Sequence, residues 1–341
     1  MSTLPDFITH EDCRSLVGDI RTRSLVARPA SVADCRKVLE YCAGAGLQVC
    51  PRGAGRSYGD AALLDSQVLL DVTGMDRILD FDQDKGQIRV EAGVRLIDIF
   101  RHVHARGLTL PASPTESHST VSGALSANVN GKDGWRQGSF YHHVLRLSLM
   151  TAAGEALEVR RGEPLFDAVV GGMGLLGIVL EATLQLRPVP SPYLAVRRIA
   201  APDVDALLAT LDKEQESSDL LVAWVDAYAG GRRRGRAVVH AARWADHDSS
   251  VAAQQALVEE AYDGLERHRH MGLAVHEMFG PLLSLMLYAQ RPLLYLFNRL
   301  YYRMSAILAG LARRPKRELF MQFSFAASFT VPPAHLVCGP R

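Results

Sequence analysis

The chain has 341 residues, of which 48% are hydrophobic and 22% charged, with 38 lysines and arginines against 37 aspartates and glutamates. This length fits two domains of ordinary size, and the composition is that of a globular protein with a sizeable core rather than a disordered chain. A formal net charge of +1 gives no reason to expect nucleic acid as the main partner.

Five cysteines occur without a C-x-x-C pair, and the N-terminal segment MSTLPDFITHEDCRS has no apolar core of the kind that a secretion signal carries. An odd number of cysteines without a signal peptide favours the reducing cytoplasm. Two histidine pairs with H-x-H spacing, at residues 102–104 and 268–270, have no further ligand at metal spacing nearby. We therefore expect a cytoplasmic protein without a bound metal.

The first predicted helix begins at Ser31, which is a plausible N-cap, and ends at Gly44 and Gly46. Cys35 and Cys42 recur on the apolar face of this helix. Cysteine behaves as a small hydrophobic residue in such a position, so we interpret both as core residues.

Strands are expected over residues 47–50, 68–72 and 87–92, followed by a second helix over 96–103 that stops at Gly107. After Pro188 the alternation of strands and helices is interrupted by the segment VPSPY, which carries two prolines. We place a domain boundary there, so that a first domain covers residues 1–188 and a second covers 189–341.

In the second part, Asp203 caps a predicted helix whose apolar side chains are expected to point inward, namely Val204, Leu207, Leu208 and Leu211. Strands are expected near residues 220–225 and 236–241, on either side of a glycine-rich turn.

Residues 281–311 are strongly apolar, but Arg291, Pro292, Arg299 and Arg303 interrupt the run, so it contains no uncharged span of 18 residues. Two interpretations remain open. The segment is either a buried helix pair or a helix at a membrane surface, with arginines reaching the water and tyrosines at the boundary.

The loop PRGAGRSYGD at residues 51–60 follows a predicted strand and has three glycines within seven positions. Such glycines let successive backbone N–H groups converge on an anion. Arg52 and Arg56 add positive charge and Ser57 adds a hydroxyl group, which an ordinary tight turn would not need. The loop is therefore expected to hold a pyrophosphate.

A second element, STVSGALSANVNG at residues 119–131, has Ser119 or Thr120 as the cap of a predicted helix. The first turn of this helix contains Ser122 and Gly123. We expect the helix start to offer N–H groups to a further phosphate oxygen or to the edge of a flavin ring.

A third segment, GMGLLG at residues 172–177, matches the glycine pattern of dinucleotide-binding turns. That pattern requires a strand before it, a helix after it and an acidic residue about 20 positions on. Here the residues that follow, 178–186, alternate as in a strand, and 190–202 contain no acidic residue. A nicotinamide site of the Rossmann type is therefore not expected.

Four segments in this order resemble the FAD domain of the vanillyl-alcohol-oxidase superfamily: PRGAGRSYGD, TVSGALSANVNGK, GSFYHHVLRLSLMTAAGE and GGMGLLGIVLEATLQLRP. Within that superfamily they are most similar to the group of decaprenylphosphoryl-β-D-ribose oxidases and related sugar and polyol oxidoreductases. The resemblance covers roughly residues 20–245, because AWVDAYAGGRRRGRAVV also matches a strand pair of the substrate domain of that group.

The resemblance implies an α+β protein, with a two-lobed PCMH-type FAD-binding domain over 1–188 and an incomplete sheet-plus-helix substrate domain over 189–341. It implies FAD bound without a covalent link, and hydride transfer to flavin N5 from an alcohol of a sugar or polyol, free or lipid-linked. A reductase or a quinone would reoxidise the flavin. A lipid-linked substrate also favours the membrane-surface interpretation of residues 281–311.

By motif position, the resemblance implies a set of residues that hold FAD: Arg52, Gly53, Ala54, Gly55, Arg56, Ser57, Tyr58, Gly59, Asp60, Ala61, Thr115, Thr120, Val121, Ser122, Gly123, Asn130, Gly131 and Ile178. Lys132 would stand beside the substrate hydroxyl as the catalytic residue. Trp224 and Asn130 would contact the substrate.

The chain departs from that group at residues 130–135, where relatives carry HGKNHH and this sequence reads NGKDGW. It also ends at Arg341, where relatives continue and supply a second active-site lysine. The resemblance therefore implies a truncated chain that turns over alcohols poorly. Two alternatives remain beside the oxidoreductase: an electron-transfer subunit of a larger dehydrogenase, and an FAD-binding remnant without activity.

Overall fold

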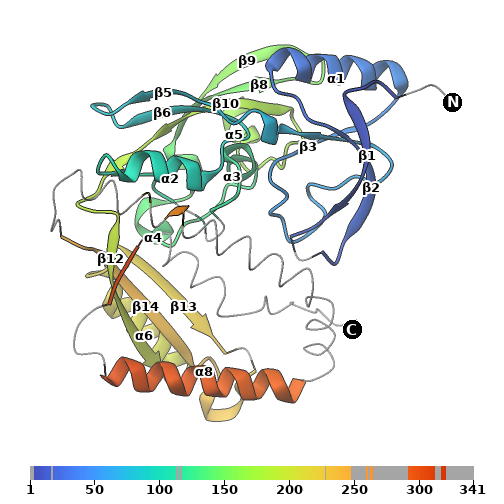
Figure 1. The fold of residues 1–341 in the computed structure, drawn as a ribbon. Coiled ribbons are helices and arrows are strands. Elements are labelled where there is room, and N and C mark those ends of the chain that lie inside the picture. The colour runs from blue at the N-terminus through green and yellow to red at the C-terminus, as the bar shows by residue number, and fades with distance from the viewer. Residues whose placement is uncertain are drawn as a thin grey trace. The chain divides into compact units, whose positions relative to one another are not determined.

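The computed structural model describes residues 4–16, 18–112, 114, 117–226, 228–246, 259, 262–263, 291–311 and 316–319. The chain divides into two compact units, Met1–Pro188 and Val189–Arg341. Each unit combines helices with sheets (Figure 1). The α+β class expected from the sequence is confirmed.

The first unit begins with a four-stranded sheet in the order β1-β2-β4-β3. Its strands are β1 (Ile8–Arg14), β2 (Arg21–Ala27), β3 (Val49–Arg52) and β4 (Val68–Asp71). β1 runs antiparallel to β2, whereas β2, β4 and β3 are parallel to one another. The carboxyl ends of β3 and β4 therefore lie at the same edge of this sheet.

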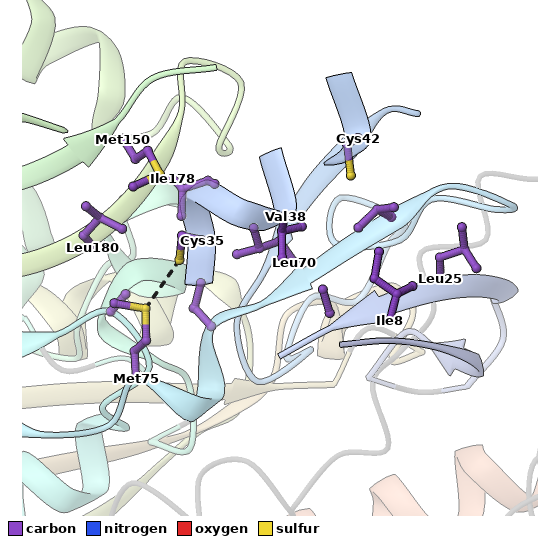
Figure 2. Packing of buried hydrophobic residues seen from close by; sticks show 14 residues of the cluster. Ile8, Leu25, Cys35, Val38, Cys42, Leu70, Met75, Met150, Ile178 and Leu180 are labelled. Atoms are coloured by element: carbon purple, nitrogen blue, oxygen red, sulfur yellow. Dashed lines mark hydrogen bonds between the residues drawn. The ribbon is translucent and has the colours of Figure 1, made fainter. Parts of the chain in front are cut away.

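Helix α1 (Val32–Ala45) packs on this sheet and follows the predicted signals. The Ser31 hydroxyl accepts a hydrogen bond from the Asp34 N–H at 3.2 Å, and Gly46 ends the helix in the left-handed conformation with φ 68°. Cys35 and Cys42 are buried in the core beneath it, and the Cys35 thiol lies 3.7 Å from the sulfur of Met75 (Figure 2). Their interpretation as core residues is confirmed, and burial raises the pKa of the Cys35 thiol to about 11.

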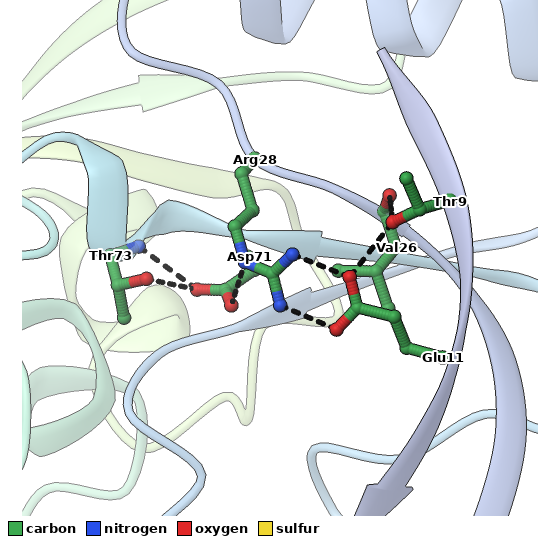
Figure 3. A network of polar contacts seen from close by, with 6 residues as sticks. All are labelled: Thr9, Glu11, Val26, Arg28, Asp71 and Thr73. Carbon is green, nitrogen blue, oxygen red and sulfur yellow. Dashed lines mark hydrogen bonds and ion pairs between the residues drawn. The ribbon is translucent and has the colours of Figure 1, made fainter. Parts of the chain in front are cut away.

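An ion-pair network ties the first sheet together (Figure 3). The Arg28 guanidinium donates to both carboxylate oxygens of Glu11 on β1, at 2.5 and 2.7 Å. Its Nε atom lies 3.3 Å from Asp71, the last residue of β4, and Asp71 in turn accepts from the Thr73 N–H at 3.0 Å. Arg28 thus links β1 to the end of β4. β4 lies next to β3, which leads into the loop after β3.

The rest of the first unit is built on a five-stranded antiparallel sheet in the order β5-β6-β10-β8-β9. Its strands are β5 (Ile78–Asp82), β6 (Gln87–Glu91), β8 (Val144–Met150), β9 (Ala156–Arg160) and β10 (Ile178–Gln185). The helices of this part are α2 (Leu96–His104), α3 (Val121–Ser126), α4 (Gly134–Gln137) and α5 (Pro164–Val169), and a short pair joins β7 (Leu108–Thr109) to β11 (Arg187–Pro188).

The second unit contains an antiparallel sheet in the order β13-β14-β12-β15. Its strands are β12 (Tyr193–Ala201), β13 (Leu220–Val225), β14 (Ala237–Trp244) and β15 (Lys316–Leu319), and its described helices include α6 (Val204–Gln215) and α8 (Arg291–Leu311). Leu207 of α6 packs with Ala201 of β12 and Val239 of β14. Trp224 of β13 and Arg236, the residue just before β14, contact tyrosines of α8 instead. Successive strand residues point to opposite faces, so α6 and α8 cover the two faces of this sheet.

The predicted inward face of α6 is only partly correct. Leu207 is buried, but Leu208 is 55% and Val204 40% exposed. Neighbouring helix residues are rotated by about 100°, so Leu208 lies off the stripe that Leu207 presents to the sheet. Val204 is the first residue of the helix and lies at its end.

Candidate functional site

The candidate site is a cleft in the first unit that encloses about 850 Å³, including space open to solvent. Three segments distant in sequence form it: the loop after β3, helix α3 with its flanks, and the turn before β10. Its lining residues are Pro51, Arg52, Gly53, Ala54, Gly55, Arg56, Ser57, Ala61, Ala62, Val72, Ser119, Thr120, Ser122, Gly123, Ala124, Ser126, Ala127, Val129, Met173, Gly174, Gly177, Ile178 and Val179.

The loop after β3 carries a run of available backbone donors. The N–H groups of residues 53–55 and 57–62 donate to no acceptor among the residues that the structure describes. Backbone N–H groups at such density normally find acceptors, and a loop that leaves them available is suited to an anion. This is the feature expected of a pyrophosphate-binding loop, so the residues present fit a dinucleotide cofactor.

Arg52 holds this loop in shape from the inside. Its guanidinium donates to the carbonyl of Ala62 at 2.7 Å and to the carbonyl of Arg14 at 3.2 Å, and so joins both ends of the loop to β1. Gly55 lies directly against it with φ 64°, and a β-carbon there would lie 2.2 Å from the Arg52 Nη2 atom. The sequence suggested Arg52 as a source of charge for the phosphates; in the structure two of its donors point to backbone carbonyls.

The start of α3 differs from the expectation. Thr120 caps the helix, and its Oγ1 accepts from the Gly123 N–H at 3.3 Å. However, the N–H groups of Val121 and Ser122 donate to the carbonyls of Val94 and Ala92, at 2.9 and 3.1 Å. The prediction that this helix start offers unused N–H groups is therefore wrong, because the chain between β6 and α2 already supplies their acceptors.

The turn GMGLLG, which matched the dinucleotide pattern, precedes strand β10 and no helix. The exclusion of a Rossmann turn is thus confirmed. The turn nevertheless lines the cleft through Met173, Gly174 and Gly177. The N–H of Met173 donates to the carbonyl of Ser126 at 3.0 Å, so this turn is fixed to the end of α3. Gly177 has φ 147°, and a β-carbon there would lie 2.4 Å from the Met150 carbonyl oxygen.

The structure therefore brings together many of the residues implied by the resemblance and separates others. Arg52 to Ser57, Ala61, Thr120, Ser122, Gly123 and Ile178 line the cleft. Those that do not line it are Tyr58, Gly59, Asp60, Val121, Asn130 and Gly131, and Thr115 lies outside the described residues.

Two of these departures have plain causes. Tyr58 is 63% exposed on the outer part of the loop, and Val121 is fully buried in the core. Sequence reasoning also missed the small residues Ala124, Ser126 and Ala127, which line the cleft from α3 and its C-cap.

The segment after α3 places Lys132 in a buried position. Burial lowers the pKa of its ammonium group to about 7, against the opposing effect of the neighbouring Asp133 carboxylate. Val129 lines the cleft, and Lys132 follows it by three residues. Three residues span at most about 11 Å, so the Lys132 backbone lies within that distance of the Val129 backbone. Gly131 permits a close approach, since a β-carbon there would lie 2.6 Å from the Ala112 carbonyl carbon.

One histidine of the H-x-H pair on α2, His104, is part of the core. His104 is fully buried with its Nε2 3.0 Å from the Thr109 hydroxyl, and burial lowers its pKa to about 3. Among the described residues, no three histidine, cysteine, aspartate or glutamate side chains are grouped as a metal site requires.

Trp224 belongs to the second unit, where its indole ring meets the edge of the Tyr301 ring at 4.7 Å between centroids. It is 6% exposed, and among the described residues its Nε1 has no hydrogen-bond acceptor. Its contact with a substrate stays a prediction, as does that of Asn130, whose backbone bridges to Ser139.

Residues 24–160 match the family of FAD binding domains. This part of the chain is an FAD binding domain of the kind found in the vanillyl-alcohol-oxidase superfamily, and its cofactor is FAD. It is 32% identical over 234 residues to decaprenylphosphoryl-beta-D-ribose oxidase of Mycolicibacterium smegmatis, covering 66% of this chain and 51% of that protein. It is 30% identical over 206 residues to L-gulono-1,4-lactone dehydrogenase of Mycobacterium tuberculosis, covering 60% and 47%.

Cytokinin dehydrogenase 2 of Arabidopsis thaliana is a more distant example, 32% identical over 167 residues that cover 48% of this chain and 33% of that protein. The chain thus spans about half the length, or less, of these relatives. The match to FAD binding domains, over residues 24–160, lies in the same unit as the cleft.

Proposed function

We propose that this protein is an FAD-dependent oxidoreductase that oxidises an alcohol of a sugar or polyol. The observation that carries the proposal is the combination, in one unit, of a cleft lined by available backbone N–H groups with a buried lysine whose pKa is about 7. The similarity to a decaprenylphosphoryl-beta-D-ribose oxidase and to an L-gulono-1,4-lactone dehydrogenase favours a sugar-derived substrate.

The loop after β3 would hold the pyrophosphate of FAD through the N–H groups of its cleft-lining residues, 53–55, 57, 61 and 62, and Arg52 would keep that loop open. Ser57 and Thr120 add hydroxyl groups to the same lining. When bound, FAD supplies the two-electron acceptor that alcohol oxidation needs.

Lys132 would accept the proton of the substrate hydroxyl. A lysine with its ordinary pKa is protonated at neutral pH and has no lone pair to accept a proton. With a pKa of about 7, a large share of Lys132 is neutral under physiological conditions, which is the state that a general base requires. The low pKa arises from burial, so the same packing that hides the side chain also prepares it for this role.

The test is anaerobic reduction of the FAD-loaded protein by a panel of polyols, sugar lactones and phosphorylated pentoses, followed by the bleaching of the flavin band. Lys132→Met should retain FAD but slow reduction about 10²–10⁴-fold, as is usual when a general base is lost. Equal rates for Lys132→Met and the wild type would remove the lysine from the mechanism. Failure of every alcohol, with reduction by a partner protein instead, would favour an electron-transfer subunit.

A further inference from the structure

Helix α8 turns two of its polar side chains toward the sheet of the second unit. Asn298 and Ser305 are buried on the side that faces the sheet, at 8% and 7% exposure. The Asn298 side-chain amide donates to Asp226 Oδ1 at 2.9 Å, and the other oxygen of Asp226 accepts two bonds from Arg236. The inner face of α8 is thus anchored by a hydrogen bond to a buried ion pair.

Aromatic contacts complete this anchor. Tyr301 packs on Trp224, and the Arg236 guanidinium lies over the ring of Tyr302, 5.1 Å from its centroid. The orientation of the helix about its own axis is therefore determined by several independent contacts. It cannot rotate to bury its other side without breaking them.

The opposite side of α8 carries an apolar stripe. The stripe consists of Leu296, Leu300, Met304, Ile307 and Leu308, which are between 49% and 61% exposed. Their spacing of 4, 4, 3 and 1 places them on one helix face over a length of about 18 Å. A helix on the surface of a globular protein usually turns such a stripe toward the core, so α8 is oriented the other way.

The charges beside the stripe have one sign. Arg299 and Arg303 lie within the helix, and residues 291–311 contain no aspartate or glutamate. Tyr295 at one end of the stripe is 38% exposed. An apolar stripe with flanking arginines and an exposed tyrosine is the pattern of helices that lie in the interface of an anionic membrane.

We propose that α8 docks the protein on an anionic membrane surface, with this stripe entering the boundary between headgroups and acyl chains. A second copy of the chain is a poorer occupant, because two such stripes packed on each other would bring arginines of like charge together. Among the described residues, no helix is long and apolar enough to cross a membrane. The proposal rests on α8 alone and does not depend on the proposed catalytic function.

The experiment is flotation of the FAD-loaded protein with phosphatidylglycerol-containing vesicles and with pure phosphatidylcholine vesicles. The wild type should float with the anionic vesicles, and added salt should weaken the binding because the arginine contribution is screened. Leu300→Gln combined with Met304→Gln should reduce binding at least tenfold. Arg299→Gln combined with Arg303→Gln should also reduce binding, but by a smaller factor.

The second unit offers a matched control. Leu208 and Val204 on α6 are also exposed apolar residues, so Leu208→Gln combined with Val204→Gln changes surface hydrophobicity to a similar extent elsewhere. This variant should bind vesicles like the wild type. Equal recovery with and without anionic vesicles would overturn the proposal, as would equal loss in the α6 and α8 variants. A concentration-dependent dimer that the α8 variant abolishes, without any vesicle binding, would assign the stripe to self-association instead.

Discussion

A β-carbon on Gly53 would lie 2.1 Å from the Oγ1 atom of Thr120, so the loop after β3 and the cap of α3 are in direct contact at this glycine. These two segments both line the cleft, and they can approach each other this closely only because residue 53 has no side chain. Thr120 cannot move away easily, because the first N–H groups of α3 are bound to carbonyls of Val94 and Ala92.

Gly53→Ala should therefore push the loop away from α3, lower FAD affinity and cost about 1–3 kcal/mol of stability, as overpacked positions do. Gly59 in the same loop is the matched control, because a β-carbon there meets nothing within 4 Å. FAD content and the thermal midpoint of both variants measure the effect. Adding Thr120→Ala to Gly53→Ala should restore part of the affinity; identical FAD content in Gly53→Ala and Gly59→Ala would refute the contact.

Arg52→Lys tests whether Arg52 acts through its shape or its charge. A lysine keeps the positive charge but cannot reproduce the fork that reaches both the Ala62 and the Arg14 carbonyls. We expect FAD affinity to fall about tenfold or more, since a hydrogen bond from a charged donor contributes about 1.5–3 kcal/mol. Titration of the apoprotein with FAD gives the dissociation constant, and wild-type affinity in Arg52→Lys would show that charge alone suffices.

The pair of Glu11 and Arg28 predicts a loss of stability in acid. The hydrogen bonds from Arg28 lower the pKa of the Glu11 carboxyl to about 2, from 4.5. A carboxyl with a lowered pKa in the fold stabilises the protein above its unfolded pKa, and this contribution disappears as the pH falls from 4.5 to 2. Both side chains are partly exposed, so Glu11→Gln should cost no more than about 1 kcal/mol at pH 7.

Urea unfolding at several pH values measures this. The difference between wild type and Glu11→Gln should shrink steadily below pH 4.5. Glu158→Gln removes the same charge from the more exposed Arg146–Glu158 pair and serves as the control. A difference that stays constant down to pH 3 would mean that the Arg28 pair contributes nothing through ionisation.

The elements with local signals were predictable from the sequence, and those stabilised by distant partners were not. Helix α1 follows from Ser31 and Gly46, and strand β10 follows from the alternation after GMGLLG. By contrast, β1 has a polar sequence, THEDCR after its first residue, and it pairs with β2 while its Glu11 binds Arg28, 17 residues later in the chain.

The site shows the same division. The glycines of the loop after β3 predicted an anion-binding loop, because the residues that form such a loop are consecutive in the sequence. The use of the Val121 and Ser122 N–H groups could not be predicted, because their acceptors lie about thirty positions earlier in the chain. For the same reason, the sequence could not show that the GMGLLG turn lines the cleft, because this depends on how α3 and β10 pack in the fold.

FAD should be released by denaturation without a covalent remnant. Covalent relatives of the resembled superfamily attach the flavin through a histidine in the phosphate-loop motif, where this chain has Arg56, and residues 119–135 contain no cysteine. Among the described residues that line the cleft, none is a histidine, cysteine or tyrosine. Acid precipitation should leave the yellow colour in the supernatant, and flavin retained in the washed pellet would contradict this expectation.

Lys132 should make the stability of the protein rise with pH. Its pKa is about 7 in the fold and 10.5 ordinarily, because burial disfavours the charged form. Between these two values the unfolded chain binds a proton that the folded chain has released, so stability increases with pH over this window. The slope is at most about 1.4 kcal/mol per pH unit, and below pH 7 both states are protonated and the penalty is complete.

Lys132→Met should remove this slope and be more stable than the wild type at pH 7, because an uncharged side chain of similar length no longer carries a buried charge. Urea midpoints at pH 7, 8 and 9 give the slopes, and Lys37→Met on the exposed side of α1 controls for the loss of one positive charge. The same pKa should appear in the rate of flavin reduction by an alcohol, which is expected to rise through about pH 7 as Lys132 becomes neutral. Parallel stability curves for wild type and Lys132→Met would show that Lys132 is hydrated and ordinary, and the proton-acceptor role would then lose its physical basis.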